Sequence, residues 1–200
     1  MKVLLAGEGA TELGDWHKEP AWRTSPCAPG VVEALAREVS AGGWTVGNAV
    51  CWRSIRKYRS GEHRHAETRN VLGVVLAARE GGYGAVLFIR DRDGSAEREA
   101  DVEAGIRLAG ESPDLENVGV AGGIATEAVE AWLLALLGQA GTERLPDPKR
   151  ELERRGLETC QSKVELIREH GIARVPNDAA SLGRWLGRVR EVLAPPVPAG

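Results

Sequence analysis

The chain has 200 residues, of which 42 % are hydrophobic and 28 % are charged, and its formal net charge is −3. This composition is ordinary for a soluble globular protein, and the negative charge excludes a general attraction to nucleic acid, so any basic surface must be local. No apolar run approaches the roughly 20 residues that a membrane helix needs. The three cysteines are far apart in the sequence, which favours a reducing cytoplasm over a disulfide framework.

Apolar runs and helical patterns alternate along the first part of the chain. The N-terminal segment MKVLLAGEGATE lacks the long apolar region of a signal peptide and predicts a first strand. Further strands are predicted at 44–52, 84–94 and 117–123, and helices at 29–43, 66–82, 95–110 and 126–138. Ser95 is a suitable N-cap for the third of these helices. This alternation predicts an α/β fold in which helices cover both faces of a mostly parallel, four-stranded sheet.

The pattern changes after residue 140, where no further strand is predicted. Helical patterns occupy 149–156, 162–171 and 178–193, and the last residues are rich in proline. We therefore expect an α/β domain at 1–140, a helical C-terminal extension packed on it at 141–194, and a flexible tail at 195–200.

Acidic residues follow three of the predicted strands. Active sites of open parallel sheets lie just beyond the carboxyl ends of the strands, so these residues are expected to share one edge. Glu8 and Glu12 follow the first strand, Asp91 and Asp93 follow the third, and Glu127 and Glu130 follow the fourth. Carboxylates crowded together repel one another unless a cation lies between them, and Mg²⁺ prefers oxygen ligands. The pattern therefore predicts a Mg²⁺ (or Mn²⁺) site.

The segment RDRDGS is central to this hypothesis. On an extended segment Asp91 and Asp93 point to the same side and Arg92 points away, while Gly94 allows a sharp turn. An EF-hand is excluded because its sixth and twelfth positions are Ala96 and Val102. A dehalogenase-type phosphatase motif is disfavoured because that motif usually follows the first strand. No P-loop motif occurs in the chain.

A simpler interpretation of the same acids stays open. Asp91 and Asp93 are also suitable turn and capping residues, and Glu127 is a favourable charge for the first turn of a helix.

The combination LLAGEGATE, LFIRDRDG, IATEAVEAWLLA and SKVELI resembles the TOPRIM domain, and more narrowly small uncharacterised bacterial TOPRIM-like proteins encoded beside ATPases in defence-type loci. The resemblance covers residues 1–140 and, loosely, the helical part. It implies that Glu8 is a general acid/base or metal ligand and that Asp91 and Asp93 hold Mg²⁺. It also implies a metal-site acid at Glu127 or Glu130, with Glu12 and Lys163 as neighbours of the metal site.

A basic loop follows the second predicted strand. Arg53, Arg56, Lys57 and Arg59 make it a candidate contact for a nucleic-acid backbone. The alternative is a solvated loop without a ligand.

Together these features predict a Mg²⁺-dependent phosphodiester hydrolase or phosphoryl-transfer enzyme acting on nucleic acid, in phage defence or DNA processing with an ATPase partner. Glu8, Asp91 and Asp93 would be its catalytic residues. The alternatives are a non-catalytic subunit that binds a partner protein, and a small-molecule phosphatase.

Overall fold

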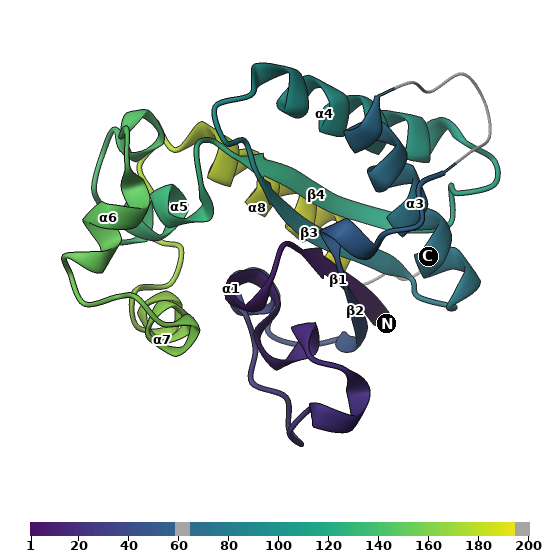
Figure 1. The fold of residues 1–200 in the computed structure, drawn as a ribbon, viewed down its shortest axis with the longest axis horizontal. Coiled ribbons are helices and arrows are strands. Elements are labelled where there is room, and N and C mark those ends of the chain that lie inside the picture. Colours follow the sequence, from purple (N-terminus) through teal and green to yellow (C-terminus); the bar gives the residue numbers. More distant parts are fainter. Residues whose placement is uncertain (59–64, 195–200) are drawn as a thin grey trace, which may run out of the picture.

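The computed structural model, which describes residues 1–58 and 65–194, confirms the α/β fold with a four-stranded, all-parallel sheet (Figure 1). The strands are β1 (Lys2–Gly7), β2 (Thr45–Cys51), β3 (Ala85–Asp91) and β4 (Gly119–Ala125). Their order in the sheet is β2-β1-β3-β4, so β1 and β3 are central. The predicted strands all form. The third predicted strand is continuously apolar because, as a central strand, it is covered on both faces.

Helices follow each strand, as the sequence pattern predicts. They are α1 (Ala10–Leu13), α2 (Val31–Val39), α3 (Ala66–Glu80), α4 (Ala96–Glu111), α5 (Val129–Leu136), α6 (Pro148–Glu153), α7 (Cys160–His170) and α8 (Ala180–Leu193). Ser95 is the N-cap of α4, and its side chain accepts a hydrogen bond from the backbone N–H of Arg98.

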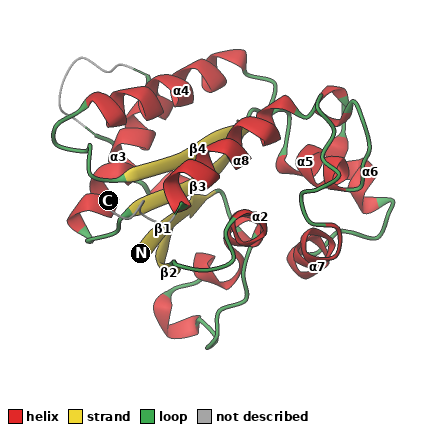
Figure 2. Ribbon diagram, turned by 180° about the vertical axis from the view of Figure 1, so that it is seen from behind, coloured by secondary structure: helices red, strands yellow, loops and turns green. Residues whose placement is uncertain are grey.

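Each face of the sheet has its own apolar core. The residues Leu4, Ala6, Val86 and Phe88 pack with α3 and α4, whereas Val3, Leu5, Leu87 and Ile89 pack with α2, α5, α7 and α8. Figure 2 shows α2 and α8 on the face opposite α3 and α4. Because side chains alternate along a strand, this division fixes which face each later residue of β1 and β3 points to.

The last helix belongs to the cover of the sheet. Trp185 of α8 is fully buried, and its Nε1 donates to the carbonyl oxygen of Phe88 at 2.9 Å. Arg188 donates from Nη1 to the carbonyl oxygen of Gly122 at 2.8 Å. In Figure 1 the helices α5, α6 and α7 instead form a group beyond the carboxyl ends of the strands. The segment after residue 140 thus covers one face of the sheet and also lies at the carboxyl edge of its strands.

We expect Trp185→Phe to lower the free energy of unfolding by about 1–2 kcal/mol, because the carbonyl of Phe88 loses a buried partner. The aromatic contact with Trp132, at a centroid distance of 5.8 Å, is kept in part. Urea denaturation followed by circular dichroism measures the effect. Trp22→Phe is the matched control, since Trp22 is 77 % exposed; equal losses in the two variants would contradict the assignment.

Among residues 1–58 and 65–194, no helix has the length and apolar character needed to cross a bilayer. The predicted tail, 195–200, lies outside the described residues.

Candidate functional site at the carboxyl edge of the sheet

The acidic segments predicted to share one edge do so. In the register of the sheet, Gly7 of β1 is paired with Cys51 of β2, and Asp91 of β3 is paired with Ala125 of β4. Glu8 therefore leaves the sheet at the same edge as Asp91 and the segment that leads into α5. The backbone N–H of Asp91 points to Glu8 Oε1 at 3.4 Å, which connects the ends of the two central strands.

The alternation of side chains divides these acids between the two faces. Asp91 lies two positions after Ile89 on the strand and therefore points to the same face, toward α5 and α7. Arg90 lies two positions after Phe88 and points to the other face, toward α3. Glu8 follows Ala6 and so lies on the same face as Arg90, with which it forms an ion pair. The edge therefore has one group of ionisable residues on each face, where the sequence suggested a single set.

The first group lies on the α5 side, and all its members except the partly exposed Asp91 are buried. It consists of Glu12, Asp91, Glu130 and Lys163. Lys163 Nζ donates to Glu130 Oε1 at 2.8 Å. Asp91 Oδ1 accepts a hydrogen bond from the backbone N–H of Val129 at 2.9 Å. The N-cap residue of α5, Ala128, has no polar side chain, so Asp91 caps the helix in its place. This capping agrees with the simpler interpretation of Asp91, although it occurs across the sheet edge.

Burial and mutual repulsion govern the charges in this group. Burial, with the negative charges of Glu12 and Glu130 adding to it, raises the pKa of Asp91 to about 7. Burial likewise raises the pKa of Glu12, and Glu130 adds to this, although the backbone N–H of Gly9 donates to Glu12 Oε2 at 2.8 Å. No lysine or arginine of the described part of the chain forms an ion pair with Asp91. The Asp91 carboxyl is therefore crowded by acids without a cation of its own.

Gly7 explains why Glu12 reaches this group. A Cβ atom at position 7 would lie 2.6 Å from the Cβ of Glu12, so only glycine allows α1 to fold back against the end of β1. Gly7 of the GEGATE segment thus has a packing role, whereas a Cβ atom at Gly9 would meet no neighbour.

The second group lies on the α3 side and alternates in charge. Arg90 pairs with Glu8 and, from Nη2, with Glu67 Oε1 at 3.2 Å. Arg98 Nε lies 3.6 Å from the same Glu67 oxygen, and its Nη1 pairs with Asp93. Glu67 also accepts a hydrogen bond from Trp52 Nε1 at 2.7 Å. Burial and the charge of Arg98 lower the pKa of Arg90, while this network keeps its guanidinium surrounded by carboxylates.

Asp93 and Glu127 differ from the geometry that the sequence suggested. β3 ends at Asp91, and Asp93 has a positive φ of 48°, so the two aspartates do not alternate along one extended strand. Glu127 precedes α5 with a φ of 65° instead of lying in its first turn, and it pairs with Arg92. The turn that follows does use Gly94, at a φ of 72°.

The donor chemistry of this edge fits Mg²⁺, because carboxylate oxygens come from adjacent strand ends. Within the ranges 1–58 and 65–194, however, no three carboxylate, histidine or cysteine side chains converge closely enough to form a metal shell. Glu8, Asp93 and Glu127 instead have arginine partners. The predicted ligands Glu8, Asp91 and Asp93 therefore do not form one metal shell within the described part of the chain.

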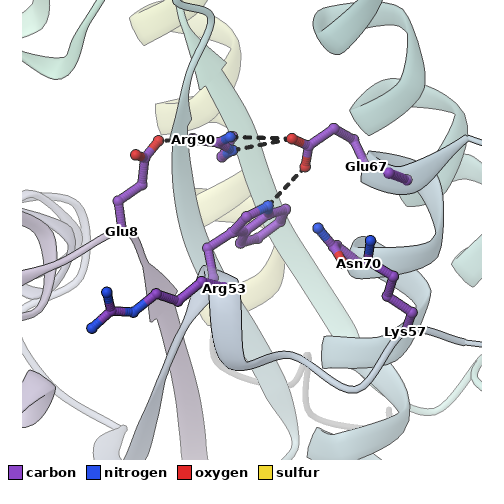
Figure 3. A pocket seen from close by; sticks show the side chains of 8 residues that line it. Glu8, Arg53, Lys57, Glu67, Asn70 and Arg90 are labelled. Carbon is purple, nitrogen blue, oxygen red and sulfur yellow. Dashed lines mark hydrogen bonds and ion pairs between the residues drawn. The ribbon is translucent and has the colours of Figure 1, made fainter.

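A pocket of about 390 Å³ opens beside Glu8 on the α3 side (Figure 3). Its wall includes Arg53 and Lys57 of the predicted basic loop, while Arg56 is exposed and does not line it. Arg59 lies outside the described residues. The structure thus places two of the four predicted basic residues in the same pocket as Glu8.

Sequence reasoning missed the residues that organise this second group. Arg90 and Glu67 lie within a predicted strand and a predicted helix, where they look like ordinary solvent-facing charges. The sequence did contain an indication for Arg90, because an arginine in an otherwise apolar central strand is partly buried and needs an acidic partner. Nothing local indicated Glu67, Trp52 or Asn70, which meet only in the folded chain.

No protein-family model, curated protein or solved structure matches this chain.

Proposed function

We propose that the protein is a divalent-cation-dependent enzyme that hydrolyses or transfers phosphodiester groups of nucleic acid. The observation that supports this most is the Asp91 carboxyl, which is crowded by Glu12 and Glu130 at the functional edge and has no basic partner among the described residues. A divalent cation relieves such crowding, and the pocket with Arg53 and Lys57 lies beside the same strand ends.

In this proposal Asp91 and Asp93 would hold Mg²⁺ or Mn²⁺, with Glu127 or Glu130 completing the set, and Glu8 would be a further ligand or the general base. The ion supplies stabilisation of the charge that develops on phosphate oxygens. Glu8 is partly exposed beside the pocket, so its carboxylate can take the proton of an attacking water as the new oxygen–phosphorus bond forms and the bond to the leaving oxygen breaks. Glu67 holds Arg90 in place, and Lys163 balances the charge of Glu130.

Cleavage of labelled single-stranded DNA, duplex DNA and RNA, with and without Mg²⁺ or Mn²⁺, tests the proposal. Glu8→Gln is expected to lower the rate by about 10²–10⁴-fold, the usual contribution of a general base. Asp91→Asn is expected to abolish metal-dependent cleavage, although it keeps an acceptor for the Val129 N–H. Glu97→Gln is the control, because Glu97 is an exposed acid of α4 that takes no part in the site.

Full activity in either site variant would contradict the proposal. A wild-type protein that hydrolyses small phosphomonoesters but no nucleic acid would indicate the small-molecule phosphatase instead. Absence of cleavage and of metal binding, together with capture of an ATPase, would favour a non-catalytic partner-binding subunit. The arginine partners of Glu8 and Asp93 are the feature that favours this second function.

A further inference from the structure

The pocket beside Glu8 combines residues from four parts of the chain. Glu8 follows β1, Arg90 belongs to β3, Trp52, Arg53 and Lys57 follow β2, and Ala66, Glu67 and Asn70 belong to the first turns of α3. Its volume of about 390 Å³ is in the lower part of the range for sites that bind small ligands. Trp52, which lines the pocket, is buried and packs against Phe88.

Some charged side chains of this pocket form ion pairs and others do not. Arg90 is balanced by Glu8 and Glu67, and Glu67 is further engaged by Trp52 and Arg98. Arg53 and Lys57 are exposed, and neither forms an ion pair with a carboxylate in residues 1–58 and 65–194. Figure 3 shows Arg53 on the side of Glu8 and Lys57 on the side of Asn70. Among the described residues, the pocket therefore presents two basic side chains outside any ion pair and one side-chain amide.

These groups match a phosphomonoester better than a phosphodiester. A phosphomonoester has a charge of about −1.5 to −2 at neutral pH and three free oxygens, whereas a diester has a single charge and two free oxygens. Two cations and an amide donor correspond to that charge and that number of oxygens. Ala66, the first residue of the 15-residue helix α3, also lines the pocket, so the helix dipole adds to the attraction for an anion.

We propose that this pocket binds the terminal phosphate of a nucleic-acid strand. The proposal rests on the proposed function, because the strand is the substrate of the neighbouring edge. Arg53 and Lys57 bind the terminal phosphate, and the Asn70 amide donates to a third oxygen. Glu8 lines the same pocket, so the end of the bound strand lies beside the proposed base.

The test is fluorescence anisotropy with single-stranded DNA of about ten nucleotides that has either a 5′-phosphate or a 5′-hydroxyl, in EDTA so that no cleavage occurs. A 3′-phosphorylated strand shows which end the pocket prefers. We expect the wild-type protein to bind one phosphorylated strand about tenfold more tightly than the unphosphorylated one, since a bond to a charged group contributes on this order. AMP should compete with that strand and adenosine should not.

Variants within the basic loop localise the effect. Arg53→Gln and Lys57→Gln, and above all the double variant, are expected to remove the preference for the phosphorylated strand. Both side chains are exposed, so these changes do not endanger folding. Arg56→Gln is the matched control, because it removes one charge of the same loop outside the pocket; it should weaken binding of all strands equally and keep the preference.

Equal affinity of the wild-type protein for all strands would overturn the proposal, and so would a preference that persists in the double variant. Competition by AMP without any binding of the strands would also overturn it, because the ligand would then be a free nucleotide. Failure of the proposed function can be distinguished from failure of this inference. In that case the protein would prefer the phosphorylated strand in EDTA but would show no metal-dependent cleavage. Cleavage without an end preference would contradict this inference alone.

Discussion

Lys163→Met is expected to lower the free energy of unfolding by about 3–5 kcal/mol, a large part of the stability of a domain of this size. Lys163 is buried, and its Nζ donates to the equally buried Glu130 at 2.8 Å. Methionine retains much of the apolar volume but leaves Glu130 beside Glu12 and Asp91 without its cation. The cost arises mainly from this uncompensated charge.

Urea denaturation followed by tryptophan fluorescence measures this loss, because Trp132 and Trp185 are fully buried. Lys149→Met is the control, since Lys149 is an exposed lysine of α6. The double variant Lys163→Met/Glu130→Leu removes both charges and should recover most of the stability. A single variant as stable as the wild type, or a double variant less stable than the single one, would contradict the assigned role.

The sequence was sufficient to predict the fold because its periodic signals are local. Each strand and helix is a short run with its own pattern, and the parallel sheet follows from their alternation. The position of Asp91 at the carboxyl edge of the sheet was predictable for the same reason. Its place just after a continuous apolar run marks the end of a central strand, and Ser95 marks the start of the next helix.

The composition of the site was less predictable because it depends on contacts between distant segments. Lys163 and Glu130 are 33 residues apart in the sequence, and Arg90 and Glu8 are 82 apart. The side-chain alternation that separates Arg90 from Asp91 is visible in the sequence, but the helices that cover each face are not. The end of β3 at Asp91 also depends on β4, whose last paired residue is Ala125.

Asp91→Asn is expected to make the metal-free protein more stable at about pH 8 and to leave its stability unchanged at about pH 4. In the folded protein Asp91 keeps its proton up to about pH 7, whereas in the unfolded chain it releases the proton near the ordinary pKa of 3.8. Between these values the folded state binds more protons, so the stability of the wild-type protein falls as the pH rises through this window. The full shift corresponds to a free energy on the order of 4 kcal/mol.

Asparagine removes this pH dependence, because it has no charge and still provides an oxygen for the Val129 N–H. Glu12, whose pKa is also raised, contributes a slope of the same sign that remains in the variant. Thermal unfolding between about pH 4 and pH 8 measures the difference, with Asp114→Asn as the exposed control. Parallel curves of stability against pH for the wild type and Asp91→Asn would show that the carboxyl is not crowded.

A divalent cation at this carboxyl favours its ionised form. Mg²⁺ should therefore raise the midpoint temperature of unfolding of the wild type at about pH 8 and leave that of Asp91→Asn unchanged.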